Sequence, residues 1–130
     1  MPIIDFPPIE SADEHGLVAV GGDLHEDSLL LAYTRGIYPW PIDPQYPMAW
    51  FSPDPRGIIP SNAFHIPRKL KKELKKSSFS IKFNTRFKDV LTQCAQVERK
   101  HEPETWISDE IINGYTNFFN KGLAYSVEVY

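Results

Sequence analysis

Hydrophobic residues in the first third of the chain follow first a strand-like and then a helix-like spacing. An apolar run at residues 17–20 ends at a Gly-Gly pair typical of a turn, which predicts a short strand. A helix is predicted over residues 27–35, and the glycine that follows it is a favourable helix stop. The helical side chains expected to face inward are Leu29, Leu30 and Tyr33.

Proline and aromatic residues dominate the segment at 37–60, which predicts an irregular loop. Proline fixes its own backbone angle and lacks an N–H donor, so we expect neither one long helix nor a central strand here. Eleven of the twelve prolines precede residue 68, so the front of the chain is expected to be rich in turns and the back to be regular. This change in composition places a soft boundary near residues 60–64.

Regular spacing returns in the second half of the chain. Short helices are predicted at 68–76 and 85–98, strands at 79–83 and 124–130, and a further helix that Ser108 caps. The apolar stripes of the two longer helices comprise Phe87, Val90, Leu91, Cys94 and Val97 in the first and Ile111, Ile112, Tyr115, Phe118 and Phe119 in the second. The position of Cys94 on its stripe predicts a buried packing residue. The order strand–helix–helix–strand favours an α/β (α+β) class, with a sheet only begun at residue 130.

Charge is distributed unevenly along this chain of net charge −3. Residues 1–34 contain no Lys or Arg, whereas residues 68–76 carry six cations and one anion. No apolar run approaches the roughly 20 residues that span a bilayer, so no membrane partner is expected. The N-terminus lacks the pattern of a secretory signal and there is a single cysteine, which together favour a cytoplasmic protein.

Two features could carry chemistry, although each also has a purely structural interpretation. The basic helix favours phosphates, but a solvated helix face is about equally compatible with it. The tryptophans and Phe51 could stack on unpaired bases, at about 1–3 kcal/mol each, although any single one is more often a core residue. The four histidines are not paired with one another or with the cysteine at ligand spacing, so no metal site is expected.

Several motifs occur in a distinctive order along almost the whole chain. They are Gly-Gly-Asp-Leu at 21–24, Arg-Gly-Ile-Tyr-Pro-Trp at 35–40, Trp-Phe-Ser-Pro-Asp-Pro-Arg at 50–56, the basic helix, Thr-Trp-Ile at 105–107, and Gly-Leu-Ala-Tyr-Ser-Val-Glu-Val at 122–129. In this order they closely resemble the leucyl/phenylalanyl-tRNA–protein transferases of bacteria. The resemblance begins near Gly16 and continues to Tyr130.

The resemblance implies an activity, a fold and a set of partners. Members of this family move Leu, Phe or sometimes Met from an aminoacyl-tRNA to a protein whose N-terminal residue is Arg or Lys, which marks that protein for degradation by the N-end rule. It implies a small N-terminal domain at 1–62 and the first part of an acetyltransferase-like (GNAT-type) domain at 63–130. The partners are then the acceptor end of aminoacyl-tRNA and the acceptor protein, and no cofactor is implied beyond the charged tRNA.

The resemblance also assigns expected roles to residues of this sequence. By motif, Trp40 and Trp106 match positions that hold the 3′-terminal adenosine and border the amino-acid pocket, and we add Trp50 and Phe51 to this aromatic set. The residues that match the basic cluster facing the tRNA acceptor stem are Arg68, Lys71, Lys72, Lys75 and Lys76.

The chain also departs from the family, because its members continue beyond the last strand. The continuation carries the groups assigned to catalysis, so the catalytic residue is unknown here and we expect weak or no activity from this chain alone. Glu104 and Glu128 are candidates for a base only by their positions. Three alternatives remain: an inactive fragment or paralogue that binds a tRNA end or a peptide, an assembly in which self-association or a partner chain completes the sheet, and a truncated form of a full enzyme.

Overall fold

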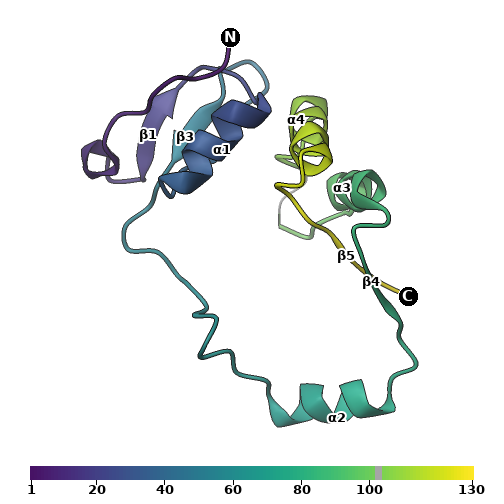
Figure 1. Cartoon of the computed structure of the whole chain (residues 1–130). Coiled ribbons are helices and arrows are strands. Elements are labelled where there is room, and N and C mark those ends of the chain that lie inside the picture. The colour runs from purple at the N-terminus through teal and green to yellow at the C-terminus, as the bar shows by residue number, and fades with distance from the viewer. Residues whose placement is uncertain (102–103) are drawn as a thin grey trace.

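The computed structural model, which describes residues 1–101 and 104–130, has a mixed α/β architecture with small antiparallel sheets (Figure 1). This agrees with the predicted α+β class. The elements, in chain order, are η1 (Ile9–Ser11), β1 (Leu17–Val20), α1 (Glu26–Thr34), β2 (Tyr38–Pro39), β3 (Ala49–Phe51), α2 (Arg68–Lys76), β4 (Ile81–Phe83), α3 (Phe87–Gln96), α4 (Asp109–Asn120) and β5 (Val127–Val129).

The first sheet has the order β1-β3-β2, with β3 antiparallel to both neighbours. The expectation that the proline-rich segment contains no central strand is therefore wrong. The part of this segment that forms β3, Ala-Trp-Phe, contains no proline. Pro39 lies in the edge strand β2, where a missing N–H is tolerated. The predicted glycine turn follows β1, and Gly21 and Gly22 adopt positive φ angles of 101° and 81° that favour glycine.

Helix α1 contacts the sheet through one face only. Leu29 and Ala32 are completely buried, whereas Leu30 is 40% exposed and Tyr33 is 47% exposed. The prediction that Leu30 and Tyr33 face the core is wrong because three consecutive leucines cannot all lie on one side of a helix. Tyr33 lies at the edge of the contact with α4, where its hydroxyl and that of Tyr115 form a 2.6 Å hydrogen bond.

One hydrophobic core contains residues from both halves of the chain. Trp50 and Leu29 from the first half join Ile111 and other buried residues of the second half in a single cluster. Gly114 of α4 makes this approach possible, because a β-carbon there would lie 2.7 Å from the β-carbon of Leu24. The domain boundary at residue 62 stays a prediction, since the two predicted parts share their core.

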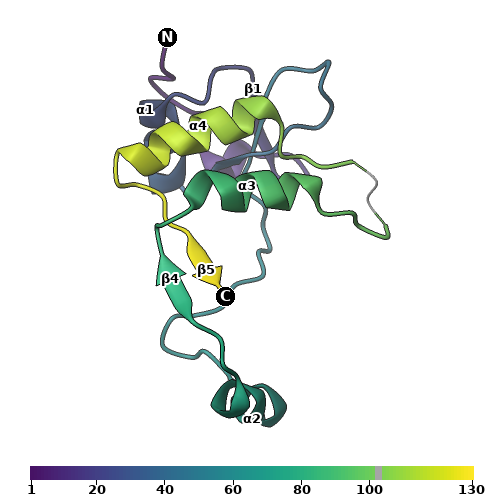
Figure 2. The same cartoon turned by 90° about the vertical axis from the view of Figure 1, so that its right-hand side faces the viewer.

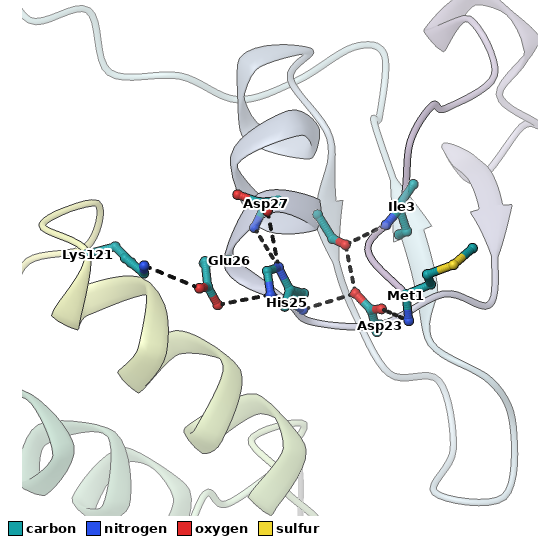
Figure 3. A network of polar contacts seen from close by, with 8 residues as sticks. Met1, Ile3, Asp23, His25, Glu26, Asp27 and Lys121 are labelled. Carbon is teal, nitrogen blue, oxygen red and sulfur yellow. Dashed lines mark hydrogen bonds and ion pairs between the residues drawn. The ribbon is translucent and has the colours of Figure 1, made fainter.

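Polar side chains at the start of α1 contact the end of α4 and the N-terminal segment (Figure 3). The ammonium of Lys121, which follows α4, lies 3.7 Å from the carboxylate of Glu26 in α1. His25 caps α1 by accepting a hydrogen bond from a backbone N–H at 3.2 Å. Burial of Asp23 opposes its ionisation, but hydrogen bonds from the Ser28 hydroxyl and the His25 N–H hold the pKa of its carboxyl below the usual value.

The second sheet consists of β4 and β5, which pair antiparallel beneath α3 (Figure 2). The predicted cap of α4 is confirmed, since the Ser108 hydroxyl accepts the Ile111 N–H at 3.3 Å. The predicted stripe of α3 is only partly confirmed: Phe87 is buried, but Cys94 is exposed and Val97 is 57% exposed. Phe87 at the start of α3 stacks on Phe119 of α4 at 4.4 Å between ring centroids, and Ala95 near its end packs against the core, so Cys94 and Val97 lie outside this contact.

Helix α2 occupies the predicted range and stands apart from the remaining elements in both views (Figures 1 and 2). It has no buried residue, and even Leu70 and Leu74 are 46% and 53% exposed. Its stripe of two leucines is too narrow to hold it against the core, so its six cations remain in solvent.

Candidate functional site

Two tryptophans that are far apart in the sequence stack on each other in the structure. The rings of Trp40 and Trp106 have centroids 4.6 Å apart and an angle of 18° between their planes. Trp40 follows β2 and its backbone N–H donates to the carbonyl of Ala49 in β3 at 2.8 Å. Trp106 lies two residues before Ser108, the N-terminal cap of α4. The first sheet therefore positions Trp40, and the segment before α4 positions Trp106. The side chain of Trp40 is partly exposed to solvent.

The stacked pair forms part of the wall of a pocket of about 540 Å³. The pocket lies between the loop that joins β2 to β3 and the segment that leads into α4. It is lined by Trp40, Pro41, Ile42, Asp43, Pro44, Tyr46, Met48, Glu104, Thr105, Trp106, Ser108, Asp109 and Glu110. We call it the tryptophan pocket. Its size and its position between two parts of the chain are typical of a ligand site.

Carboxylates dominate the polar groups of the tryptophan pocket. Asp43 comes from the loop between β2 and β3, Glu104 precedes Trp106, and Asp109 and Glu110 belong to the first turn of α4. The described residues that line it include no Lys or Arg. Aromatic rings and carboxylates together attract an amino group and disfavour phosphate. A ligand that carries both groups would therefore have to bind with its phosphates outside the pocket.

The other two aromatic candidates do not line this pocket. Trp50 is fully buried in β3, where its indole N–H donates to the Gly21 carbonyl at 2.8 Å and its ring meets Phe6 edge to face. Because successive side chains of a strand point to opposite faces, Phe51 lies on the other side of the sheet and stacks on Tyr38. Their predicted roles in substrate binding stay predictions, and in the structure both rings pack around β3 beside the loop of the pocket.

The predicted tRNA contacts of α2 lie on an exposed helix away from the stacked tryptophans. All five residues, Arg68, Lys71, Lys72, Lys75 and Lys76, are exposed. They remain candidates for contacts with phosphates, and the structure brings none of them to the tryptophan pocket.

The two glutamates considered as bases have different surroundings. Glu104 is exposed at the tryptophan pocket. Glu128 is 7% exposed, and its Oε1 accepts hydrogen bonds from the Arg86 N–H at 2.8 Å, the Thr85 N–H at 3.2 Å and the Ser126 hydroxyl at 2.8 Å. Burial of Glu128 opposes ionisation, but these hydrogen bonds hold the pKa of its carboxyl below the usual value. Glu128 therefore acts as a cap at the start of α3.

Sequence reasoning did not place Asp43, Met48, Asp109 or Glu110 at the site. The sequence accounts for Asp109 and Glu110 as acidic residues that favour the positive N-terminal end of α4. The loop between β2 and β3, which carries Asp43 and Met48, has no sequence feature that indicates a site apart from its proximity to Trp40. Within the described residues, no three His, Cys, Asp or Glu side chains are placed so that they could hold a metal ion. No helix in that part of the chain is long and apolar enough to cross a membrane.

Comparison with known families gives two adjacent matches. The family described as leucyl/phenylalanyl-tRNA protein transferase matches residues 58–130, and the N-terminal domain of the same transferase matches residues 22–54. The chain belongs to the leucyl/phenylalanyl-tRNA protein transferase family. This confirms the resemblance seen in the order of the sequence motifs.

Relatives named leucyl/phenylalanyl-tRNA–protein transferase occur in several bacteria. The protein from Myxococcus xanthus is 42% identical over 96% of this chain and 53% of its own length. The protein from Dechloromonas aromatica is 44% identical over 99% of this chain and 56% of its own length, and that from Flavobacterium johnsoniae is 41% identical over 96% and 58%. The chain thus spans about half the length of the transferase relatives that it matches.

The tryptophan pocket draws on both transferase matches. Trp40 lies within the match to the N-terminal domain, and Trp106 lies within the match to the longer part. The site therefore needs both parts of the family sequence, and the shared hydrophobic core holds them in place.

Proposed function

We propose that this chain provides the site for the charged tRNA end in an aminoacyltransferase. The transferase moves Leu, Phe or Met from aminoacyl-tRNA to proteins with an N-terminal Arg or Lys and so marks them for N-end-rule degradation in the cytoplasm. The observation that carries this proposal is the Trp40–Trp106 stack, which lies at a pocket between the two matched parts of the transferase family.

The tryptophan pocket has surfaces suited to each part of an aminoacyl-adenosine. The terminal base stacks on the exposed side of Trp40, because centroids 4.6 Å apart leave no room for a base between the two rings. The side chain of the amino acid lies against Met48 and Ile42, where burial of a Leu or Phe contributes roughly 1.5–3 kcal/mol. The α-amino group lies near the carboxylates at the pocket.

The phosphates of the acceptor stem bind to α2 in this proposal. Its cations are separated from the acidic tryptophan pocket, which matches a ligand with a phosphate backbone at one end and an amino acid at the other. RNA helices are recognised largely by charge and shape, so an exposed basic helix suffices for this contact.

The reaction would be an aminolysis of the ester. The neutral α-amine of the acceptor attacks the ester carbonyl, a peptide bond forms, the ester C–O bond breaks, and a proton passes from the amine to the departing ribose hydroxyl. This requires a neutral amine held near the ester and donors for the oxyanion. In this proposal Glu104, which lines the tryptophan pocket, holds the incoming amine, whereas Glu128 accepts backbone hydrogen bonds at the start of α3.

We also propose the division into a small domain at 1–62 and the beginning of an acetyltransferase-like domain at 63–130. The two family matches, which end and begin at residues 54 and 58, support a boundary in this part of the chain. Such a boundary would lie in the extended connection between β3 and α2 (Figure 1).

A transfer assay tests the function directly. The purified chain is mixed with labelled Phe-tRNA or Leu-tRNA and a peptide that begins with Arg, and peptide-bound label is measured. Transfer that depends on the N-terminal Arg and is lost in Trp40→Ala would support the complete proposal. The matched control is Phe79→Ala, which removes an exposed aromatic ring outside the tryptophan pocket.

The second candidate function is a binding fragment that holds a tRNA end or a peptide and needs further polypeptide for activity. It is favoured by the coverage of only about half of each relative. Binding of a phenylalanyl-adenosine amide by a chain that gives no transfer from Phe-tRNA would favour this function. The absence of both binding and transfer would refute both candidate functions.

A further inference from the structure

The strand that leads to Trp40 makes few backbone contacts with the rest of the first sheet. β2 is an edge strand of two residues, Tyr38 and Pro39, and it pairs with β3. Proline lacks an N–H, so Tyr38 is the one residue of β2 that can donate a backbone hydrogen bond. The next donor along the chain is Trp40 itself, whose N–H bonds to the Ala49 carbonyl at 2.8 Å. A strand held by so few bonds needs further contacts to keep a fixed position.

The guanidinium of Arg56 bridges β2 and β3 at the end of their ladder that lies away from Trp40. The ladder pairs Tyr38 with Phe51. The Nη2 of Arg56 donates to the Gly36 carbonyl, which precedes β2, at 2.9 Å, and to the Ser52 hydroxyl, which follows β3, at 3.4 Å. One nitrogen thus ties the chain that enters β2 to the chain that leaves β3.

Arg56 also contacts the side chain of β2. Its guanidinium carbon lies 5.6 Å from the centroid of the Tyr38 ring, which is within the range of a cation–π contact. The same ring stacks on Phe51 of β3, with centroids 6.4 Å apart. Because Tyr38 precedes Trp40 by only two residues, contacts that fix Tyr38 limit where Trp40 can lie.

Neighbouring carboxylates do not explain the position of Arg56. Glu10 and Asp54 line the same hollow of about 390 Å³ as Arg56, but within the part of the chain that the structure describes neither forms an ion pair with it. The guanidinium instead bonds to acceptors on both sides of the β2–β3 ladder. A planar guanidinium can donate along its edge and lie over a ring with its face, whereas a lysine ammonium acts as a point charge.

We propose that Arg56 is a positioning residue for the Trp40–Trp106 stack. It holds the start of β2 to the end of β3, so that β2 places the ring of Trp40 against that of Trp106. Arg56 is not among the described residues that line the tryptophan pocket, so it acts through β2. The effect of Arg56 on ligand binding rests on the proposed function, whereas its effect on the stack does not.

Circular dichroism of the free protein measures the stack directly. Two indole rings with centroids 4.6 Å apart couple their electronic transitions and give an exciton couplet, which is assigned by its loss in Trp106→Phe. Arg56→Met keeps an unbranched side chain but removes the donors and the charge, so it should remove most of the couplet. Arg56→Lys keeps the charge and a donor group and should restore part of it.

Arg35→Met is the matched control for a general loss of stability. Arg35 also donates from an exposed guanidinium to a backbone carbonyl, that of Phe6 at 3.3 Å, but this contact ties the N-terminal segment to the end of α1. Arg35→Met should therefore keep the full couplet. Thermal unfolding of each variant shows that it is folded at the temperature of the measurement. If Arg56→Met does not fold, Arg56→Lys alone decides, with a reduced couplet expected.

Binding of the phenylalanyl-adenosine amide extends the test from the stack to the site. Arg56→Met should raise the Kd by about threefold or more when Trp40 is present, but should leave it unchanged in the Trp40→Ala background, because residues that act through one another are not additive. A residue that only stabilises the fold would change the Kd equally in both backgrounds.

A couplet that is reduced in Arg56→Met, partly restored in Arg56→Lys and complete in Arg35→Met supports the proposal. An unchanged couplet in Arg56→Met would overturn it, as would an equal loss in Arg35→Met or an equal change in Kd in both Trp40 backgrounds. A couplet that depends on Arg56 in a chain that does not bind the amide would support the positioning role and refute the proposed function. The two failures are therefore distinguishable.

Discussion

Replacing Trp40 by alanine tests whether the stacked tryptophans hold an unpaired base. Trp40 is 42% exposed, with Trp106 stacked on one side of its ring, so its free surface is available to a ligand. Stacking of a base on an aromatic side chain contributes about 1–3 kcal/mol. At about 1.4 kcal/mol for each tenfold change, Trp40→Ala should raise the Kd by about 5- to 150-fold. Trp40→Phe retains a ring and should weaken binding less.

The assay is calorimetric titration with a phenylalanyl-adenosine amide that cannot undergo transfer. The weakening in Trp40→Ala should be nearly independent of salt, because stacking involves no counterion release. Thermal unfolding of the same variant measures what the Trp40–Trp106 stack contributes to stability, about 0.5–1.5 kcal/mol beyond its buried area. An unchanged Kd in a folded Trp40→Ala variant, with Phe79→Ala equally unaffected, would show that the base binds elsewhere.

Three further changes test α2, the packing between the two halves and the capping carboxylate. Glutamine in place of the lysines of α2 should weaken tRNA binding and reduce the slope of log K against log salt concentration by about 0.9 for each phosphate that is no longer neutralised. Filter binding at several salt concentrations measures this slope. An unchanged slope would show that α2 does not contact the tRNA phosphates. Gly114→Ala gains about 1 kcal/mol of helix propensity, but its β-carbon would lie 2.7 Å from that of Leu24. Overpacking of this kind costs about 1–3 kcal/mol. Urea unfolding should therefore show a net decrease in stability, whereas a more stable variant would mean that the two halves are not packed so closely. Hydrogen bonds lower the pKa of the folded Glu128 carboxyl, so its stabilisation is present above the unfolded pKa and is lost as the pH falls through the folded pKa. The free energy of unfolding should consequently fall less steeply with decreasing pH in Glu128→Gln than in wild type or the exposed control Glu10→Gln. Parallel plots of this free energy against pH would contradict the role of Glu128.

The sequence alone predicted those features that depend on neighbouring residues. The range of α2, the Ser108 cap of α4 and the glycine turn after β1 follow from helical periodicity, a side-chain acceptor before a helix, and positive φ angles. The order of motifs likewise identified the transferase family, because each motif is read within a few consecutive residues.

Expectations failed where the result depended on distant parts of the chain. Three consecutive leucines do not specify which side of α1 meets the sheet, so Leu30 was wrongly placed inside. A segment rich in proline contributes the central strand β3 because β1 and β2 provide partners on both sides. Cys94 was expected to be buried from its helical stripe, but it is exposed, because the side of α3 that meets the rest of the fold carries Phe87 and Ala95.

The candidate site shows the same division between local and distant information. The sequence singled out four aromatic residues and matched two of them, Trp40 and Trp106, to a family motif, but it did not show which rings meet. The tertiary structure places Trp40 against Trp106, encloses Trp50 in the core and turns Phe51 to the opposite side of the sheet. Residue identity and local pattern thus determined the family, the basic helix and the helix caps. Packing between segments more than 60 residues apart decided the pocket, because only the folded chain brings Trp40 and Trp106 together.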